Sequence, residues 1–174
     1  FKLRWPKLDR PGAALAGAAA MVAFGVIAPE KVPAAIDFDT LILLLGMMLL
    51  SAYLTRAGFF RNTAFWVIHY THTPRMLLIA LAVVSAVLSA FLVNDTVCLL
   101  LTPLVLGLTA SAQLPPTPYL LTLCMASNAG SVATFTGNPQ NMLIGNLSHQ
   151  SYASFAAYMA LPAIVSTAVV VAVI

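Results

Sequence analysis

The sequence has 174 residues, of which 61% are hydrophobic and 7% charged, whereas soluble domains are about 45 to 50% apolar and about 25% charged. Because so few charges cannot cover a water-facing surface, the composition predicts an all-α integral membrane protein and excludes an ordinary soluble domain. The net charge of +3 comes from eight Lys and Arg residues at or before Arg75, with no basic patch and interleaved aromatic residues, so nucleic acid is not an expected partner.

Residues 1–57 are predicted to be a scaffold of transmembrane helices. The Ala-rich stretch from Gly12 to Ala28 is expected to be a first span rather than a signal peptide, because no clear cleavage context follows and further membrane segments do. Residues 40–55 predict a second span. Under the positive-inside rule, the N-terminus and the region from Arg56 to Arg75 are expected in the cytoplasm, and the acidic connector 29–39 outside.

Residues 58–74 predict a helix that lies along the membrane interface. The stretch FFRNTAFWVIHYTHT is too short to span the membrane, and its aromatic and basic residues suit the boundary between lipid and water. His69 and His72 are three residues apart, but no third ligand is nearby, so we interpret them as interfacial side chains rather than metal ligands.

Residues 75–174 are predicted to form half of a transport domain. The apolar stretch 76–112 is too long for one helix and is interrupted by Asn94-Asp95-Thr96, which predicts two helical arms joined at a polar tip. The arms are either two full spans or a re-entrant hairpin. Charge topology does not choose between these, because both return the chain to the same face.

Asp95 is the only residue with a formal charge between Met76 and Ile174. A carboxylate at the bilayer centre costs at least about 2.5 to 3.5 kcal/mol, so we interpret Asp95 as functional. The structural alternative is a helix N-cap, since Asp satisfies free N–H groups there and interacts well with the positive end of the helix dipole. Ser, Thr or Asn would cap without a charge, which favours the functional interpretation.

A second broken element follows, in which the apolar pieces 119–127 and 142–147 flank NAGSVATFTGNPQN. Irregular backbone at membrane depth costs several kcal/mol per unpaired group unless protein, water or an ion satisfies it. Transporters direct half-helix dipoles and freed carbonyls at substrate and ions in this way, although a kink or an extramembrane loop is the structural alternative. Residues 152–174 predict a last span, bent at Pro162.

We predict that the hairpin tip and the break form half of an ion and substrate site, with neutral hydrogen-bonding side chains and glycines that let the backbone approach a ligand. The candidate residues are Asn94, Asp95, Thr96, Ser127, Asn128, Gly130, Ser131, Thr134, Gly137, Asn138, Pro139 and Asn141. Hard cations favour oxygen ligands, and the expected sodium ligands are Asn94, Asp95, Asn128 and Gly130. Cys98 and Cys124 lie in apolar runs, so neither a disulfide nor a soft-metal site is expected.

The motifs VNDTVCLLLTPLVL and ASNAGSVATFTGNPQNMLIG, together with GMMLLSAYLTRAGFF, resemble the ion transporter superfamily over roughly residues 39–162. That superfamily includes divalent-anion sodium symporters, arsenite efflux permeases and sodium/proton antiporters. The resemblance implies a re-entrant hairpin tip at 94–96 and a loop between half-helices that carries the remaining candidates. By position, Asn128, Gly130 and Thr134 match one part of the loop motif, and Gly137, Pro139 and Asn141 match its ending.

The resemblance also implies sodium and substrate bound where the two loops meet, a homodimer, and an inverted second repeat that carries a second hairpin. One departure concerns Asp95, since the symporters usually show Ser-Asn-Thr at the tip, whereas Asn-Asp is typical of the permeases and antiporters. A fixed charge repels a carboxylate substrate by about 4 kcal/mol at about 4 Å in an effective dielectric near 20. The GNPQN ending, however, resembles the symporter-like branch.

We therefore expect an ion-coupled secondary transporter of a small anion in a bacterial inner membrane, with sodium or a proton as the coupling ion and no other cofactor. The alternatives are a sodium/proton antiporter, a metalloid efflux permease and, in another class, a non-transporting membrane subunit or channel half. An enzyme is not expected, because no Ser/His/Asp set, metal cluster or phosphate loop appears.

Overall fold

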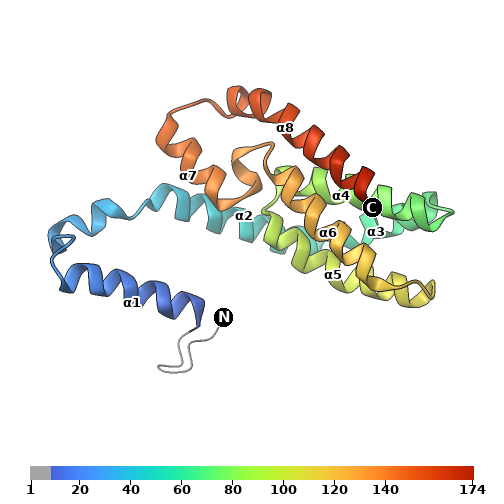
Figure 1. The fold of residues 1–174 in the computed structure, drawn as a ribbon, viewed down its shortest axis with the longest axis horizontal. Helices are drawn as coiled ribbons and strands as arrows, with labels where there is room; N and C mark the ends of the chain where they lie inside the picture. Colours follow the sequence, from blue (N-terminus) through green and yellow to red (C-terminus); the bar gives the residue numbers. More distant parts are fainter. Residues whose placement is uncertain (1–8) are drawn as a thin grey trace. The chain divides into compact units, whose positions relative to one another are not determined.

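A computed structural model describes residues 9–174, in which the regular segments are helices and no strand occurs (Figure 1). The chain divides into two compact units, Phe1–Phe38 and Asp39–Ile174. In the first unit, the side chain of Asp9 caps helix α1 (Arg10–Ala23) by accepting a bond from the Gly12 N–H at 2.9 Å. The 14 residues of α1 measure about 21 Å, less than the about 30 Å of a bilayer core. The helix is thus shorter than the predicted span, and its crossing of the membrane stays a prediction.

The first unit continues with two short 3-10 turns, η1 (Pro29–Lys31) and η2 (Pro33–Ala35). Four helices among the described residues are long and apolar enough to cross a membrane. They are α2 (Phe38–Arg56), α4 (Pro74–Phe91), α5 (Asn94–Ser111) and α8 (Tyr152–Val173). The short helix α3 (Phe59–Tyr70) forms where the aromatic and basic stretch predicted one.

Helices α4, α5 and α6 (Pro116–Ser131) pack into a three-helix bundle (Figure 1). The hydroxyl of Tyr119 donates to the Pro74 carbonyl oxygen at 3.3 Å, and the hydroxyl of Thr134, beyond the other end of α6, donates to the Ala90 carbonyl oxygen. Helix α6 therefore runs parallel to α4 with an almost constant offset. Apolar residues of all three helices fill the core of the bundle, among them Leu81 and Leu123.

The approach of α6 to α4 depends on small side chains. A Cβ atom added to Gly130 would lie 2.1 Å from the Ala86 carbonyl oxygen, closer than any side chain tolerates. Ala82 and Ala126 are buried at the same contact. Small residues every four positions allow two membrane helices to approach closely, and here they bring the end of α6 beside the end of α4.

Beyond α6, the chain forms a 3-10 turn, η3 (Phe135–Gly137), the short helix α7 (Pro139–Ser148) and then α8. The Phe135 ring lies 4.3 Å from that of Phe155 and 5.7 Å from that of Tyr152, measured between ring centroids. A Cβ atom on Gly145 would lie 2.6 Å from the Phe135 ring. Phe135 therefore connects the break to both α7 and α8.

Candidate functional site

The turn of the hairpin is apolar, which corrects the sequence prediction of a polar tip. Leu92, in an extended conformation, and Val93 connect the two arms, and both are buried. The polar triplet 94–96 instead forms the first turn of α5. The two apolar residues reach the core of the bundle, so the turn needs no solvated side chains. The triplet is left at the beginning of a helix, where backbone N–H groups are free of intrahelical partners.

Asp95 is exposed in this first turn and makes no hydrogen bond or ion pair with any described residue. The N-cap position belongs to Val93, so Asp95 is not the N-cap that the structural alternative supposed. Its charge does lie at the positive end of the α5 dipole, which is worth about 0.3 to 1 kcal/mol for an exposed carboxylate. An unpaired, accessible carboxylate remains.

The structure brings the beginning of α5 against the end of α6. The Asn94 Nδ2 atom donates to the Asn128 Oδ1 atom at 3.2 Å, and the Cys98 Sγ and Ser127 Oγ atoms are 2.8 Å apart. Asn128 also donates to the Cys124 carbonyl oxygen at 2.8 Å. Asn94 and Ser127 are buried, whereas Asn128 is exposed. The two motifs predicted to meet therefore do lie side by side, joined directly by a side-chain hydrogen bond.

The break after α6 is organised by Asn141. Its Nδ2 atom donates to the carbonyl oxygens of Ser131 at 3.2 Å, Val132 at 3.2 Å and Thr134 at 2.9 Å. Asn138 adds to this arrangement, since its Oδ1 atom caps α7 by accepting from the Asn141 N–H at 2.8 Å. Carbonyls that the sequence predicted to be free for a ligand are therefore bonded within the protein.

The remaining loop positions also serve this internal arrangement. The Nδ2 atom of Asn138 lies 3.2 Å from the Ser131 Oγ atom and 3.3 Å from the Ser131 carbonyl oxygen. A Cβ atom on Gly137 would lie 2.0 Å from that same carbonyl oxygen, so only glycine fits there. Pro139 occupies the first turn of α7, where its missing N–H costs nothing.

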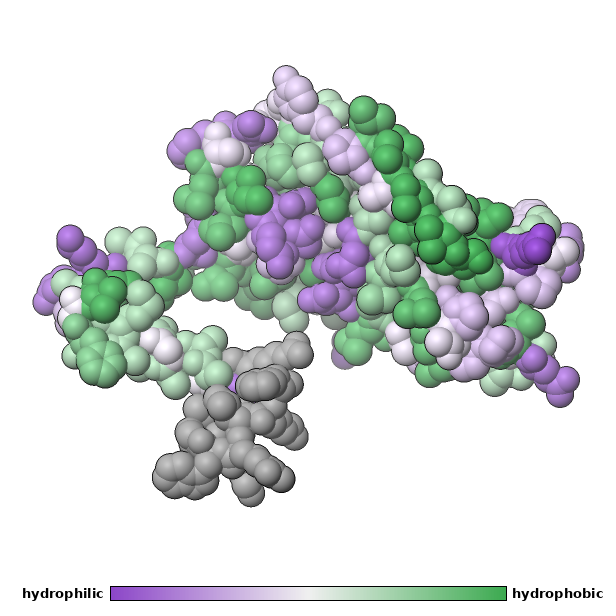
Figure 2. All heavy atoms as spheres, viewed as in Figure 1, coloured by the Kyte–Doolittle hydropathy of each residue, from purple (hydrophilic) through white to green (hydrophobic). Residues whose placement is uncertain are grey.

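The predicted residues thus separate into two groups, which we call the tip cluster and the break cluster. The tip cluster is Asn94, Asp95, Thr96, Ser127 and Asn128, and the break cluster is Gly130, Ser131, Thr134, Gly137, Asn138, Pro139 and Asn141. In Figure 2, hydrophilic surface lies where the end of α6, the break and the beginning of α7 come together, bordered by hydrophobic surface.

Asp95 supplies the negative charge at the tip, and Asp39, in the first turn of α2, lines a pocket together with Phe135 of the break. No Lys or Arg occurs after Arg75, which lies in the first turn of α4. The 18 residues of α4 separate Arg75 from the tip by about 25 Å. Among the described residues, no group of three His, Cys, Asp or Glu side chains is placed to hold a metal ion. A bound cation would therefore depend on Asp95 and neutral oxygen atoms.

Sequence reasoning missed the contribution of α4. Ala86 and Ala90 touch the break cluster, and their four-residue spacing, matched by Ala126 and Gly130, was a usable signal of close packing. It also missed the contact of Cys98 with Ser127, which joins residues 29 positions apart. The hydroxyls of Ser85 and Ser89 are buried on α4 and have no hydrogen-bond partner within residues 9–174.

Comparison with known proteins adds independent information. The family described as citrate transporter matches residues 3–174. The silicon efflux transporter LSI3 of Oryza sativa is 40% identical over 148 residues, which are 85% of this chain and 30% of that protein. The inner membrane protein YbiR of Escherichia coli is 37% identical over 137 residues, which are 79% of this chain and 37% of that protein.

A protein of Dictyostelium discoideum that is named as a transporter, arsB, is 34% identical over 148 residues, which are 85% of this chain and 26% of that protein. The chain therefore spans between about a quarter and two fifths of the length of these three relatives. No solved structure matches the chain significantly.

Proposed function

Since the chain belongs to the citrate transporter family, we propose that it forms half of an ion-coupled secondary transporter for a small anion. Membership of this family indicates transport rather than catalysis. The observation that carries the proposal is the bond from Asn94 to Asn128, because it joins the hairpin to the broken helix beside the exposed Asp95. This is the geometry expected of a site at discontinuous helices.

In this proposal, Asp95 binds the coupling cation or carries the proton. The side chains of Asn94 on α5 and Asn128 on α6 lie next to each other, and their amide oxygens supply neutral ligands for sodium. Gly130 faces the Ala86 backbone, an arrangement that favours close packing over ligation. The anion would meet the free N–H groups at the beginning of α5, once the cation has neutralised Asp95.

A second candidate function is export of a neutral inorganic acid, as the resemblance to metalloid permeases suggests. The specific observation in its favour is the lack of any Lys or Arg after Arg75, because at the tip an anion would meet the negative Asp95 and no cationic side chain. A neutral acid avoids the repulsion between that carboxylate and an anionic substrate. The name of the rice relative, a silicon efflux transporter, is consistent with this alternative. A sodium/proton antiporter would use Asp95 for both ions in turn.

The quaternary and membrane arrangement is part of the proposal. Helices α4 and α5 have 18 residues each, a length that is compatible with two full spans. We nevertheless propose a re-entrant hairpin, which the family resemblance implies. An inverted second repeat would supply the other half of the site, and the assembly would be a homodimer. We place the N-terminus in the cytoplasm of a bacterial cell.

The decisive experiment measures flux by the full-length protein in proteoliposomes. Citrate, arsenite and silicic acid are tested under sodium and pH gradients, with the wild type and Asp95→Asn compared. We expect Asp95→Asn to reduce coupled flux by at least about tenfold, the loss that corresponds to about 1.4 kcal/mol. Flux of sodium or protons without any of these substrates would favour the antiporter.

Asp39→Asn provides the matched control, because Asp39 is also an exposed carboxylate in the first turn of a membrane helix. It should transport like the wild type. If Asp95→Asn keeps wild-type flux with the same sodium and pH dependence, the central role of Asp95 is wrong.

A further inference from the structure

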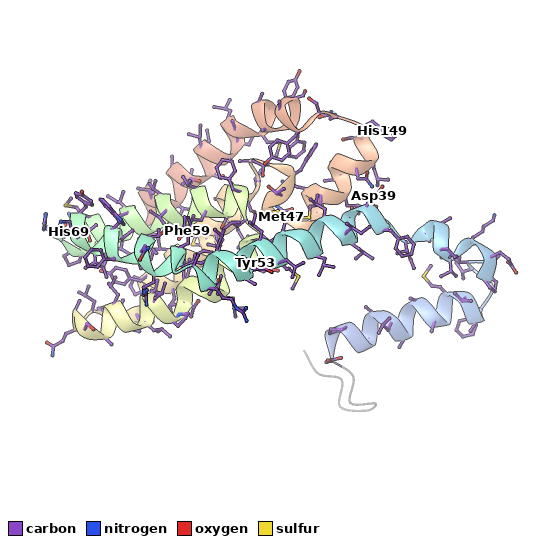
Figure 3. All side chains as sticks on the ribbon, turned by 180° about the vertical axis from the view of Figure 1, so that it is seen from behind. Asp39, Met47, Tyr53, Phe59, His69 and His149 are labelled. Atoms are coloured by element: carbon purple, nitrogen blue, oxygen red, sulfur yellow. The ribbon has the colours of Figure 1, made fainter. Side chains whose placement is uncertain are left out.

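A groove of about 730 Å³ lies between α3 and the ends of the hairpin arms, at the opposite end of the bundle from Asp95. It is bordered by α3 on one side and by the beginning of α4 and the end of α5 on the other. Figure 3 shows α3, from Phe59 to His69, running along these helices. Pockets that bind small molecules have volumes of about 300 to 1,000 Å³, and the groove falls in this range. Nothing in the proposed transport mechanism uses this groove.

The groove is lined by apolar side chains and by two basic ones. Its walls carry apolar side chains of α3 and α5, including Phe65, Ile68, Leu104 and Leu108. Arg61 and His72 line the same groove, and both are exposed. A long apolar slot with a cationic group along it matches an amphipathic molecule with an acidic head.

Within the unit Asp39–Ile174, Arg61 has no acidic partner. The sequence contains no Asp or Glu between Asp39 and Asp95, and Asp95 lies at the far end of the hairpin. A guanidinium presents a planar fork of donors that fits a phosphate in two-point contact. The beginning of α4 also lines the groove at Thr73 and Pro74, which adds the positive end of a helix dipole.

We propose that this groove binds an anionic phospholipid, with the phosphate on Arg61 and one acyl chain along α3 and α5. The aromatic side chains of α3 suit the level of lipid headgroups, since Trp66 stacks on Tyr70 at 5.4 Å and both are exposed. The lipid thereby holds the interfacial helix α3 against the hairpin of the proposed transport domain.

The test uses the delipidated full-length protein, incubated in detergent with phosphatidylglycerol or phosphatidylcholine, and counts retained lipid by native mass spectrometry. We expect preferential retention of phosphatidylglycerol. Arg61→Gln should weaken it about fivefold, the factor expected for one basic residue at an anionic membrane. Arg56→Gln is the matched control, because Arg56 is exposed in the last turn of α2 and does not line the groove.

A second variant fills the groove without changing charge. A Cβ atom on Gly107 meets nothing within 4 Å, and Gly107 lines the groove, so Gly107→Leu should abolish retention of the lipid. Gly46→Leu is its control, because Gly46 is equally open but lies on α2 away from the groove.

Three results would overturn the proposal. They are equal losses for Arg56→Gln and Arg61→Gln, displacement of the lipid by excess inorganic phosphate alone, and a Tm lowered by Gly107→Leu in lipid-free protein. The last result would show that the rest of the polypeptide covers the groove.

Discussion

The tip cluster and the break cluster have similar compositions but opposite roles. Both are rich in Asn, Ser and Thr, and both lie where a helix is interrupted. In the break cluster the donors and acceptors bond with one another, as Asn141 does with the carbonyl oxygens of three residues. In the tip cluster, Asp95 has no hydrogen bond to any residue that the structure describes, and Asn128 is exposed. Proximity to the proposed ion site therefore does not by itself make a polar residue a ligand.

The difference follows from what an unpaired group costs. A broken helix leaves several carbonyls without intrahelical partners, and in lipid each one must find a bond. Asn138 and Asn141 meet that need within the protein, so the carbonyl oxygens that they contact do not need an ion as partner. The tip cluster joins the beginning of α5 to the end of α6, and it keeps Asp95 and Asn128 accessible, although Asn94 and Ser127 are buried.

The strongest test of this distinction is Asn141→Leu. The substitution keeps the approximate volume but removes the donors to Ser131, Val132 and Thr134. Buried acceptors left unpaired cost about 1 to 3 kcal/mol each. The Ser131 and Thr134 oxygens keep weaker partners, at 3.3 Å and 3.4 Å, so we expect a loss of about 2 to 4 kcal/mol. Thermal unfolding of the full-length protein in detergent measures it.

Gln140→Leu is the matched control for that variant. Gln140 is the neighbouring residue on α7 and is exposed, so the change should stay within about 0.5 kcal/mol. If Asn141→Leu unfolds at the same temperature as Gln140→Leu but loses transport, Asn141 is a ligand and the two clusters are one site.

The next largest effect is expected for Gly130→Ala. The added methyl group would lie 2.1 Å from the Ala86 carbonyl oxygen and 2.3 Å from its Cα atom, so one of the two backbones must move. Overpacking of this kind costs about 1 to 3 kcal/mol. The same substitution at Gly46, whose Cβ would meet nothing within 4 Å, should stabilise α2 by up to about 1 kcal/mol. A lower Tm for Gly130→Ala than for Gly46→Ala, measured without substrate ions, would show that Gly130 serves helix packing; equal Tm values would contradict that role.

Several features of this fold could be read from the sequence because they follow from composition and length. The span at 40–55, the short helix after Gly58, the two arms and the broken helix all appear close to their predicted positions. Each depends on apolar runs and on the residues that interrupt them. The meeting of the tip with the break was also expected, from the complementary polar side chains of the two segments and from the family resemblance rather than from spacing.

The sequence could not show which polar residues bond to each other. The three bonds of Asn141 join it to residues 7 to 10 positions away through an irregular turn, and no periodic pattern encodes that geometry. The exact turn was missed for a related reason. Leu92 and Val93 resemble their apolar neighbours in sequence, and only packing against the bundle makes them the turn.

The smallest effect, and the sharpest test of the tip cluster, concerns the bond between Asn94 and Asn128, which measures 3.2 Å. A double-mutant cycle with Asn94→Ala and Asn128→Ala should give a coupling energy of about 0.5 to 1.5 kcal/mol in the absence of substrate ions. If both amides also hold sodium, the coupling measured from Tm should increase when sodium is added, because each single variant already loses the bound ion. A coupling energy that is the same with and without sodium would assign this pair a structural role. Of the proposed ligands Asn94, Asp95 and Asn128, only Asp95 would then remain as an ion-binding group.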